Sequence, residues 1–328
     1  MTQLTLPPAT NCRYTFVGEG AANVVFEVHP QPEGGDNDNH NVFKGYLLRV
    51  PKAGTKAFPY SELQSYWQSV VRPLFDEGDL TEQRLVRLDA SGETISSLNK
   101  VLEKNEACRR KDFRGSRVAK AEYGMLVDDM CKKHPDDVVL EFKPKWLAQS
   151  PSAPASARRC RNCAREACKS SGKPIICSLD FFESPGDPQA LPLTLARLTS
   201  SLLPENPEGN EHARLAHWLQ TNTLIPRLRD LQVSFDSNGP LSRKTDARDL
   251  QLAMTLRDCS CFVRIPARAD LPVEAKLADL DKKNGMAKLE YWQRTERELI
   301  EGGTTTEQSS HRERRTASWR EPLLAIET

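Results

Sequence analysis

The chain has 328 residues, of which 38% are hydrophobic and 28% charged, and its formal net charge is +1. That length can form two domains with their own cores, and the near-zero charge excludes a protein that binds polyanions over its whole surface. No apolar run approaches the roughly 18 residues of a membrane span, and residues 1–4 lack the basic start of a signal peptide, so we expect an intracellular protein without a membrane partner.

The N-terminal part of the chain predicts strands joined by turns and followed by a helix. Residues 13–17 and 24–28 are apolar, β-branched runs on either side of a glycine turn, and residues 42–50 form a third such run. The intervening residues 31–41 are rich in Gly, Asn and Asp, which is typical of a hairpin loop. Residues 59–75 carry a helix-like pattern, which completes a unit of three strands and a helix.

The glycine turn is a candidate phosphate site. Gly18 and Gly20 lack side chains, so their backbone N–H groups can approach phosphate oxygens closely. The turn joins two strands, as in the loop with which a protein-kinase-like lobe covers ATP, whereas Rossmann and Walker turns join a strand to a helix. Arg49 lies in an apolar strand about 30 residues downstream, where such lobes place a cation against the phosphates. An ordinary hairpin and a surface arginine on an edge strand remain the alternatives.

A proline flanked by two lysines follows the next predicted strand. Residues 137–140 are a short apolar run typical of a buried strand, and residues 141–145 read Glu-Phe-Lys-Pro-Lys. Side chains alternate along a strand, so Lys143 and Lys145 lie on one side, with the backbone between them fixed by Pro144. Two ammonium groups held this close repel unless an anion lies between them, and phosphate is the usual candidate. A solvated strand end is the alternative.

Basic residues are concentrated around this motif. The segment from Lys104 to Lys173 holds 17 Lys and Arg against 9 Asp and Glu, an excess of eight positive charges. Such a local excess in a nearly neutral chain favours one focused anion site, and a solvated basic face is the alternative.

Four of the nine cysteines fall in one 18-residue window, at positions 160, 163, 168 and 177. Cysteines in an intracellular protein are thiols or metal ligands more often than disulfides, and Cys160, Cys163, Cys168 and Cys177 could form a tetrahedral zinc site. Their spacing fits no common zinc class, so unpaired thiols in a helix, Cys163 and Cys168 among them, are the interpretation that we favour. The region lacks interleaved aromatic residues for base stacking, so we expect no direct nucleic-acid partner.

The rest of the chain predicts a linker, helices and a tail. Residues 148–158 are rich in Pro, Ser and Ala, which is typical of a flexible linker. Apolar residues recur at helical spacing between residues 191 and 231, which predicts core helices. Residues 302–328 are polar, and we expect them to be loosely ordered.

Three aspartates in the C-terminal third of the chain are candidate catalytic or metal-binding residues. Residues 252–265 predict a strand, a tight turn that contains Asp258, and a second strand, and Asp279 and Asp281 follow about 20 residues later on one side of an extended segment. Phosphoryl transfer needs one carboxylate to orient or deprotonate the attacking hydroxyl and another to hold Mg²⁺. Turn and capping residues are the alternative for each of these aspartates.

Together and in this order, the motifs resemble those of the inositol-pentakisphosphate 2-kinases over roughly residues 13–292. The resemblance is carried by the glycine loop at residues 18–23, Glu-Phe-Lys-Pro-Lys at residues 141–145, Leu-Arg-Asp-Cys-Ser at residues 256–260 and Asp-Leu-Asp-x-Lys at residues 279–283.

The resemblance implies an α+β fold distantly related to protein kinases. It implies a small, antiparallel β-rich N-lobe at residues 1–135, a larger α/β C-lobe with an inositide-binding insertion at residues 136–302, and a polar tail at residues 303–328. The implied reaction transfers the γ-phosphate of ATP, with Mg²⁺, to the axial 2-hydroxyl of inositol 1,3,4,5,6-pentakisphosphate and yields inositol hexakisphosphate. The family also implies a nuclear or cytoplasmic location, and we expect a monomer.

Residue roles follow from the same resemblance. Asp258 would activate the 2-hydroxyl, Lys143 would contact both the inositide and the transferring phosphate, and Asp279 and Asp281 would hold Mg²⁺. Nucleotide contacts are implied for Gly18, Glu19, Gly20, Ala21, Ala22, Asn23, Arg49 and Glu141, and inositide contacts for Lys143, Lys145, Arg114, Lys169, Lys283 and Tyr291.

The chain departs from the family pattern in two places. Ala287 stands where the family places a second inositide-binding arginine, with Lys288 beside it. Plant members hold zinc with two cysteines and two histidines, and those histidines have no match here, so zinc is not implied by the resemblance. The alternatives left open are a kinase for another inositol phosphate and a non-catalytic, zinc-stabilised scaffold that binds inositides.

Overall fold

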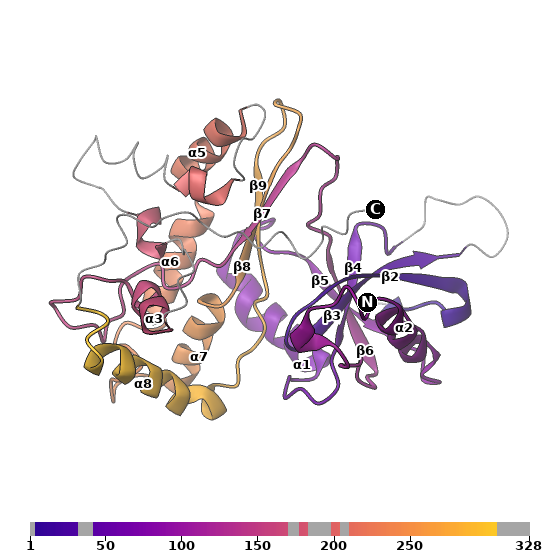
Figure 1. Cartoon of the computed structure of the whole chain (residues 1–328), viewed down its shortest axis with the longest axis horizontal. Helices are drawn as coiled ribbons and strands as arrows, with labels where there is room; N and C mark the ends of the chain where they lie inside the picture. Colours follow the sequence, from indigo (N-terminus) through magenta and orange to yellow (C-terminus); the bar gives the residue numbers. More distant parts are fainter. Residues whose placement is uncertain (1–3, 32–41, 170–176, 183–197, 204–209, 307–328) are drawn as a thin grey trace. The chain divides into compact units, whose positions relative to one another are not determined.

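The computed structural model describes residues 4–31, 42–169, 177–182, 198–203 and 210–306 (Figure 1). These residues form a mixed α+β fold with a six-stranded and a three-stranded sheet. They divide into two compact units, one made of residues 4–70 and 81–131 and the other of residues 71–80 and 132–306, each as far as it is described. The predictions for residues 32–41, 191–197 and 307–328 lie outside the described residues.

The first unit is built on a six-stranded sheet of order β1-β5-β6-β4-β3-β2. The predicted strands on either side of the glycine turn are β2 and β3, and the third is β4, so this part of the sequence-based prediction is confirmed. All neighbouring strands are antiparallel except β1 and β5. The strands are β1 (Leu4–Thr5), β2 (Cys12–Glu19), β3 (Asn23–Pro30), β4 (Tyr46–Pro51), β5 (Gln83–Arg87) and β6 (Tyr123–Asp128).

Two helices cover opposite faces of this sheet. Leu126 of β6 belongs to the cluster that contains Leu98 and Leu102 of α2 (Glu93–Lys104), whereas the adjacent Met125 packs with Leu63 of α1 (Tyr60–Tyr66). Successive side chains of a strand point to opposite faces, so α2 and α1 lie on different sides. The predicted helix at residues 59–75 begins as α1 and continues as a π-helical stretch (Trp67–Val71) and a 3-10 turn (Arg72–Leu74).

The second unit combines a small sheet with five labelled helices. The sheet has the order β7-β8-β9, and both of its pairings are antiparallel. In Figure 1, helices α5 to α8 gather on one side of this sheet, and α7 packs against both α6 and α8. The elements are β7 (Val138–Phe142), α3 (Arg161–Lys169), α5 (Glu211–Thr221), α6 (Leu224–Ser234), α7 (Ala247–Leu256), β8 (Ser260–Ile265), β9 (Glu274–Ala278) and α8 (Gly285–Glu301).

One predicted strand is wrong, because the residues before Asp258 are the end of helix α7. The side chain of Asp246 caps this helix by accepting the backbone N–H groups of Arg248 and Asp249. Helix α7 packs between other elements, so most of its second half is buried and apolar. A short apolar run without polar interruptions does not distinguish a buried helix from a strand, and this ambiguity caused the error.

The predicted flexible linker at residues 148–158 is also wrong. The segment forms successive turns, with the N–H of Ala153 bonded to the carbonyl of Ser150 and that of Ala157 to Pro154. Ser150 is buried and its hydroxyl bonds the carboxylate of Glu296. The carbonyl of Thr305 accepts the N–H groups of Arg158 and Arg159, so the start of the predicted loose tail packs here. Pro and Ser are typical of ordered turns as well as of linkers.

Among the described residues, no helix combines the length and apolarity that crossing a bilayer requires.

Candidate functional site

The antiparallel order of the small sheet brings three distant motifs to one of its edges. Strands β7 and β9 both run opposite to β8, so the ends of β7 and β9 lie beside the start of β8. Lys143 follows β7 directly, Asp258 precedes the first residue of β8 by two positions, and Asp279 follows β9. Residues separated by more than 100 positions in the sequence therefore meet at one place.

Three lysines surround Asp258. Its Oδ1 lies 3.1 Å from Nζ of Lys145, its Oδ2 lies 2.7 Å from Nζ of Lys283, and its backbone carbonyl accepts a hydrogen bond from Nζ of Lys143 at 3.2 Å. Nζ of Lys143 also lies 3.7 Å from Oδ2 of Asp279. Burial alone would raise the pKa of the Asp258 carboxyl, but the attraction of Lys283, Lys145 and Lys143 outweighs it and holds this pKa well below its ordinary value. Asp258 is therefore ionised.

The carboxylates of Glu141 and Asp279 share one hydroxyl. The Oγ of Ser260 lies 2.7 Å from Oε1 of Glu141 and 3.4 Å from Oδ2 of Asp279. Asp279 has a φ of +59°, a left-handed conformation that aspartate tolerates, and 56% of its side chain is exposed. Mg²⁺ prefers carboxylate oxygens, so Asp279 and Glu141 fit as its ligands. The backbone carbonyl of Asp281, two residues further on, accepts the hydroxyl of Thr255 at 3.4 Å.

The segment after Lys143 is a constrained turn. The N–H of Lys145 bonds the carbonyl of Lys143 at 2.8 Å across the intervening proline. Trp146 then adopts a φ of +52°, which is rare for a bulky residue and costs of order 1–3 kcal/mol. Two guanidinium groups lie over its ring, with Cζ of Arg257 at 3.6 Å and that of Arg161 at 4.3 Å from a ring centroid, and such contacts stabilise the strained conformation.

A single buried glutamine joins this turn to the end of α7. The Nε2 of Gln232 donates to the carbonyls of Pro144 and Leu256, both at 3.1 Å, and its Oε1 accepts the N–H of Leu147 at 3.0 Å. Gln232 is 1% exposed. It therefore fixes the lysine turn relative to Asp258, which follows Leu256 by two residues. No sequence motif marks this glutamine, because its role depends on backbone groups from two other segments.

Gln232→Leu is expected to lower the free energy of unfolding by about 2–4 kcal/mol, because three buried backbone groups lose their partner and each unsatisfied group costs about 1–3 kcal/mol. Urea unfolding measures this change. Gln220→Leu, at an exposed position of α5, should alter stability by less than about 0.5 kcal/mol. Equal effects of the two substitutions would show that the hydrogen bonds of Gln232 do not hold the turn.

A pocket of about 260 Å³ opens beside Asp258. Of the predicted residues, Lys145, Asp258, Lys283 and Tyr291 line it. Lys169 does not: it is exposed and pairs with Glu166.

Four further cations among the described residues line this pocket, namely Arg161, Arg165, Arg257 and Lys288. Nη2 of Arg165 donates to the Tyr291 hydroxyl at 2.7 Å, and Lys288 is the neighbour of Ala287. The wall therefore regains positive charge although Ala287 replaces the expected arginine. The sequence feature that could have placed Arg165 on the same helix face as Arg161 is its position one helical turn later.

The glycine turn of the first unit has open space beside Gly20 and is held in place by hydrogen bonds to Asn23. The N–H of Gly20 bonds the carbonyl of Asn23 at 2.9 Å, and no atom lies within 4 Å of where a Cβ of Gly20 would stand. The Asn23 Oδ1 accepts the Tyr60 hydroxyl at 2.8 Å, and Cζ of Arg49 lies 5.3 Å from the Tyr60 ring centroid. Arg49 is 6% exposed in the interior strand β4, so the alternative of a surface arginine on an edge strand is wrong. In the same turn, Ala21 is exposed, Ala22 is half-buried and Gly18 is buried.

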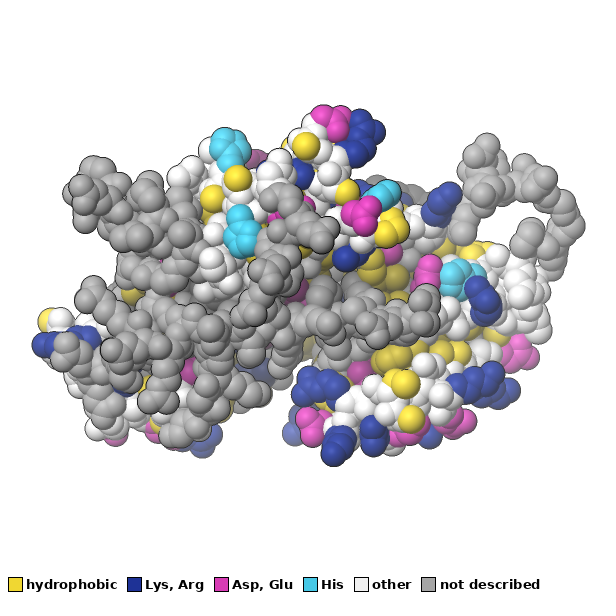
Figure 2. Space-filling view, turned by 45° about the horizontal axis from the view of Figure 1, so that its top comes forward, with side chains coloured by type: hydrophobic (Ala, Val, Ile, Leu, Met, Phe, Trp, Pro, Cys, Tyr) yellow, Lys and Arg dark blue, Asp and Glu magenta, His cyan; other side chains and the backbone are white. Residues whose placement is uncertain are grey.

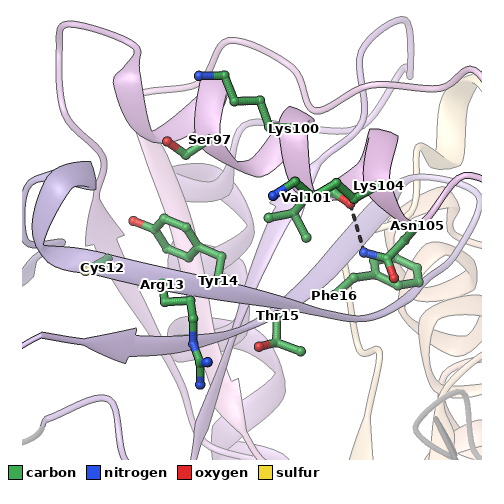
Figure 3. A pocket seen from close by; sticks show the side chains of 10 residues that line it. All are labelled: Cys12, Arg13, Tyr14, Thr15, Phe16, Ser97, Lys100, Val101, Lys104 and Asn105. Carbon is green, nitrogen blue, oxygen red and sulfur yellow. Dashed lines mark hydrogen bonds between the residues drawn. The ribbon is translucent and has the colours of Figure 1, made fainter. Parts of the chain in front are cut away.

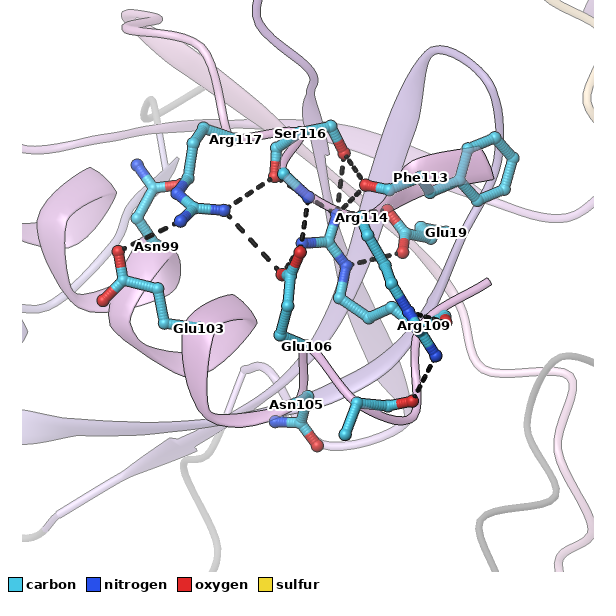
Figure 4. A network of polar contacts seen from close by, with 12 residues as sticks. Glu19, Asn99, Glu103, Asn105, Glu106, Arg109, Phe113, Arg114, Ser116 and Arg117 are labelled. Carbon is cyan, nitrogen blue, oxygen red and sulfur yellow. Dashed lines mark hydrogen bonds and ion pairs between the residues drawn. The ribbon is translucent and has the colours of Figure 1, made fainter. Parts of the chain in front are cut away.

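The side chain of Glu19 points into the protein (Figure 4). Its carboxylate receives Nε and Nη2 of Arg109 at 2.7 and 2.8 Å, and Nζ of Lys52 at 2.5 Å. Burial would raise the pKa of Glu19, but Arg109 and Lys52 outweigh it, so this pKa is lowered. Only the backbone of Glu19 remains available to a ligand. Arg114 is exposed beside this network and donates to the carbonyls of Arg109 and Ala107.

A second pocket, of about 500 Å³, lies between β2 and α2 (Figure 3). Its lining combines apolar residues with Lys100 and Lys104, and none of the predicted site residues lines it.

Three of the four clustered cysteines meet. The sulfurs of Cys160, Cys163 and Cys177 all lie within 4.8 Å of one another, whereas Cys168 is exposed and stands outside the group. Cys163 and Cys168 both lie in helix α3 as free cysteines, in agreement with the favoured interpretation of unpaired thiols in a helix.

The basic residues between Lys104 and Lys169 fall in both units. On the face seen in Figure 2, lysines and arginines of the described residues lie among acidic side chains. Several of these cations are used in ion pairs: Arg109 with Glu19 and Glu106, Arg117 with Glu103, Lys133 with Glu274, Arg161 with Glu296, and Lys169 with Glu166. The charge at the candidate site comes from lysines close in space, including Lys283 from outside the segment.

Comparison of the sequence with known proteins points to one family. The profile of the family described as inositol-pentakisphosphate 2-kinase matches residues 16–298. Inositol-pentakisphosphate 2-kinase of Eremothecium gossypii is 28% identical over 292 residues, which are 87% of this chain and 96% of that protein. The enzymes of the same name from Yarrowia lipolytica and Kluyveromyces lactis are 33% and 31% identical over about half of each chain: 51% and 50% of this chain, and 54% and 50% of theirs. The family match covers most of the sequence and all the motifs at the sheet edge, and the chain therefore belongs to the inositol-pentakisphosphate 2-kinase family.

Proposed function

We propose that the chain transfers the γ-phosphate of ATP to the 2-hydroxyl of inositol 1,3,4,5,6-pentakisphosphate, giving inositol hexakisphosphate. The family and the names of the relatives support a kinase that acts on an inositol phosphate. The observation that carries the proposal is the position of the Asp258 carboxylate between Lys145 and Lys283, on the wall of a basic pocket and beside Lys143.

The lysines match what such a substrate requires. A pentakisphosphate bound next to ATP brings two polyanions together, and several cations must offset their repulsion. Without substrate, Asp258 and Asp279 supply the counter-charge for the three lysines. Phosphates of the substrate would replace the two carboxylates as partners of the lysine ammonium groups. Arg165 and Lys288 would extend the positive wall of the pocket.

The same exchange would prepare Asp258 for catalysis. A carboxyl whose pKa is held far below its usual range by three lysines is a weak base. When substrate phosphates draw the positive charge of Lys145 and Lys283 toward themselves, the pKa of Asp258 rises, and the carboxylate can accept the proton of the 2-hydroxyl. Substrate binding would thus create the base that the reaction uses.

Nucleotide and metal would be held by the remaining residues. Mg²⁺ supplies charge neutralisation across the transferring phosphates, and Asp279, Glu141 and Asp281 would hold it. Residues 18–23 would cover the nucleotide phosphates through backbone N–H groups, with Arg49 as the nearby cation. This division corresponds to a distant protein-kinase-like fold with a small nucleotide lobe and a larger inositide lobe.

The direct test incubates the purified chain with Mg-ATP and inositol 1,3,4,5,6-pentakisphosphate and follows inositol hexakisphosphate by anion-exchange chromatography. We expect stoichiometric formation of ADP and the hexakisphosphate. A higher kcat/KM for another inositol phosphate would replace the proposed substrate, and absence of turnover with every isomer would leave a non-catalytic inositide-binding protein.

Lys145→Met is expected to raise the KM for the pentakisphosphate by about 10–100-fold, because one charge-assisted contact contributes about 1.5–3 kcal/mol. The KM for ATP should stay unchanged. Lys244→Met, at an exposed position of the same unit, should leave both constants as in the parent chain. Steady-state kinetics with each substrate varied in turn decides, and an unchanged inositide KM would remove Lys145 from the binding site.

A further inference from the structure

The three-cysteine group has the geometry of a metal site. The Sγ atoms of Cys160 and Cys177 are 3.7 Å apart, and the third sulfur lies within 4.8 Å of both. Tetrahedral Zn²⁺ with Zn–S bonds of about 2.3 Å separates its sulfurs by about 3.8 Å, whereas a disulfide requires about 2.05 Å. The spacing between Cys160 and Cys177 thus suits two ligands of one ion.

The surroundings favour thiolates. Cys160 immediately precedes α3, and its sulfur accepts the N–H of Cys163 at 3.3 Å. A helix N-terminus stabilises negative charge, and this nine-residue helix directs its first turn at the sulfurs. Cys160 and Cys163 are 3% and 8% exposed, and Cys177 is half-buried, so the group is closed on most sides.

We propose that Cys160, Cys163 and Cys177 bind one Zn²⁺ ion as thiolates, with the fourth position taken by a solvent molecule. Sulfur ligands select a thiophilic ion over Mg²⁺ or Ca²⁺, and zinc is the common one with tetrahedral thiolate sites. Binding releases the three thiol protons and changes no oxidation state. Cys168, the fourth cysteine of the window, takes no part.

This ion would anchor the helix that borders the inositide pocket. Asn162, between the two cysteines of the CxxC pair, donates to the carbonyl of Lys145 and, at 2.8 Å, to the hydroxyl of Ser178, which follows Cys177. Arg161 stacks on Trp146, and Arg165 one turn later bonds Tyr291. Joining Cys177 to the first turn of α3 through a metal would therefore hold that turn against the backbone of Lys145.

Metal content tests the site independently of any kinase activity. The whole chain is purified without chelators and analysed by inductively coupled plasma mass spectrometry. We expect about one zinc per chain. Cys163→Ser and Cys177→Ser should each lower the zinc content at least fivefold, and Cys168→Ser, on the same helix, should retain it. Circular dichroism reports whether each variant is folded.

A second measurement does not depend on the variants. The parent chain is stripped of metal, its thiols are kept reduced, and Co²⁺ alone is added. Three thiolate ligands should give an intense thiolate-to-cobalt charge-transfer band and tetrahedral visible bands. The proposal would be overturned if the zinc-free protein gave no such spectrum on addition of Co²⁺. It would also be overturned if the metal-free chain contained a Cys160–Cys177 disulfide, or if Cys168→Ser lost as much zinc as Cys163→Ser and Cys177→Ser.

Discussion

Asp258→Asn is expected to lower kcat for inositide phosphorylation by about 10²–10⁴-fold, the range that general-base catalysis contributes. Asparagine keeps the shape of the side chain and cannot accept the proton of the attacking hydroxyl. It also frees Lys145 and Lys283 from their counter-ion. The KM for the polyanionic substrate should therefore stay the same or fall while kcat collapses, a combination that loss of the fold would not produce.

The matched control for this prediction is Asp249→Asn. Asp249 is exposed on the first turn of α7, the helix that ends just before Asp258. This variant should keep the kcat and KM of the parent chain in steady-state assays with Mg-ATP and the inositide. If Asp258→Asn turned over at the parent rate, Asp258 would be a structural partner of the lysines and the base would have to be sought elsewhere.

Glu19→Ala is expected to lower the free energy of unfolding of the first unit by about 3–5 kcal/mol. The substitution leaves the buried Arg109 and Lys52 without the carboxylate that they share, and an uncompensated buried charge has a cost of this order. Because β2 and the loop after α2 meet at this carboxylate, the loss should appear as an earlier transition in thermal unfolding.

An exposed pair provides the control. Glu122 lies 3.7 Å from Arg87 in the same unit, with both side chains more than half exposed. Glu122→Ala should change stability by less than about 1 kcal/mol, the usual range for surface ion pairs. An equal effect of both substitutions would show that Glu19 contributes no more than a surface carboxylate.

The contribution of Glu19 also has a defined pH dependence. Its pKa is lowered in the folded chain, so its stabilisation is fully present above the pKa of an unfolded glutamate, about 4.3, and is lost as pH falls through the lowered value. The difference in stability between the parent chain and Glu19→Ala should therefore shrink below about pH 4.3.

Local chemistry could be predicted wherever neighbouring residues determine it. The strands on both sides of the glycine turn follow from β-branched runs separated by small residues, and β2, β3 and β4 confirm them. Lys143 and Lys145 both reach Asp258, Lys143 at its backbone carbonyl and Lys145 at its carboxylate, but they do so from a turn after β7 and not from the strand alternation that the sequence predicted. The strand predicted before Asp258 failed because a helix buried on several sides has no polar face to reveal its period.

The sequence by itself determined which residues carry charge and thiol chemistry, and in which order along the chain. Only the tertiary structure decided which of them meet. The antiparallel edge of β7, β8 and β9 joined Lys143, Asp258 and Asp279. In the first unit, packing turned Glu19 inward to Arg109, and around α3 it separated Cys168 from the other sulfurs. The physical reason is that charge neutralisation and metal ligation depend on distances between atoms, and those distances are set by strand pairing and helix packing between segments far apart in the chain.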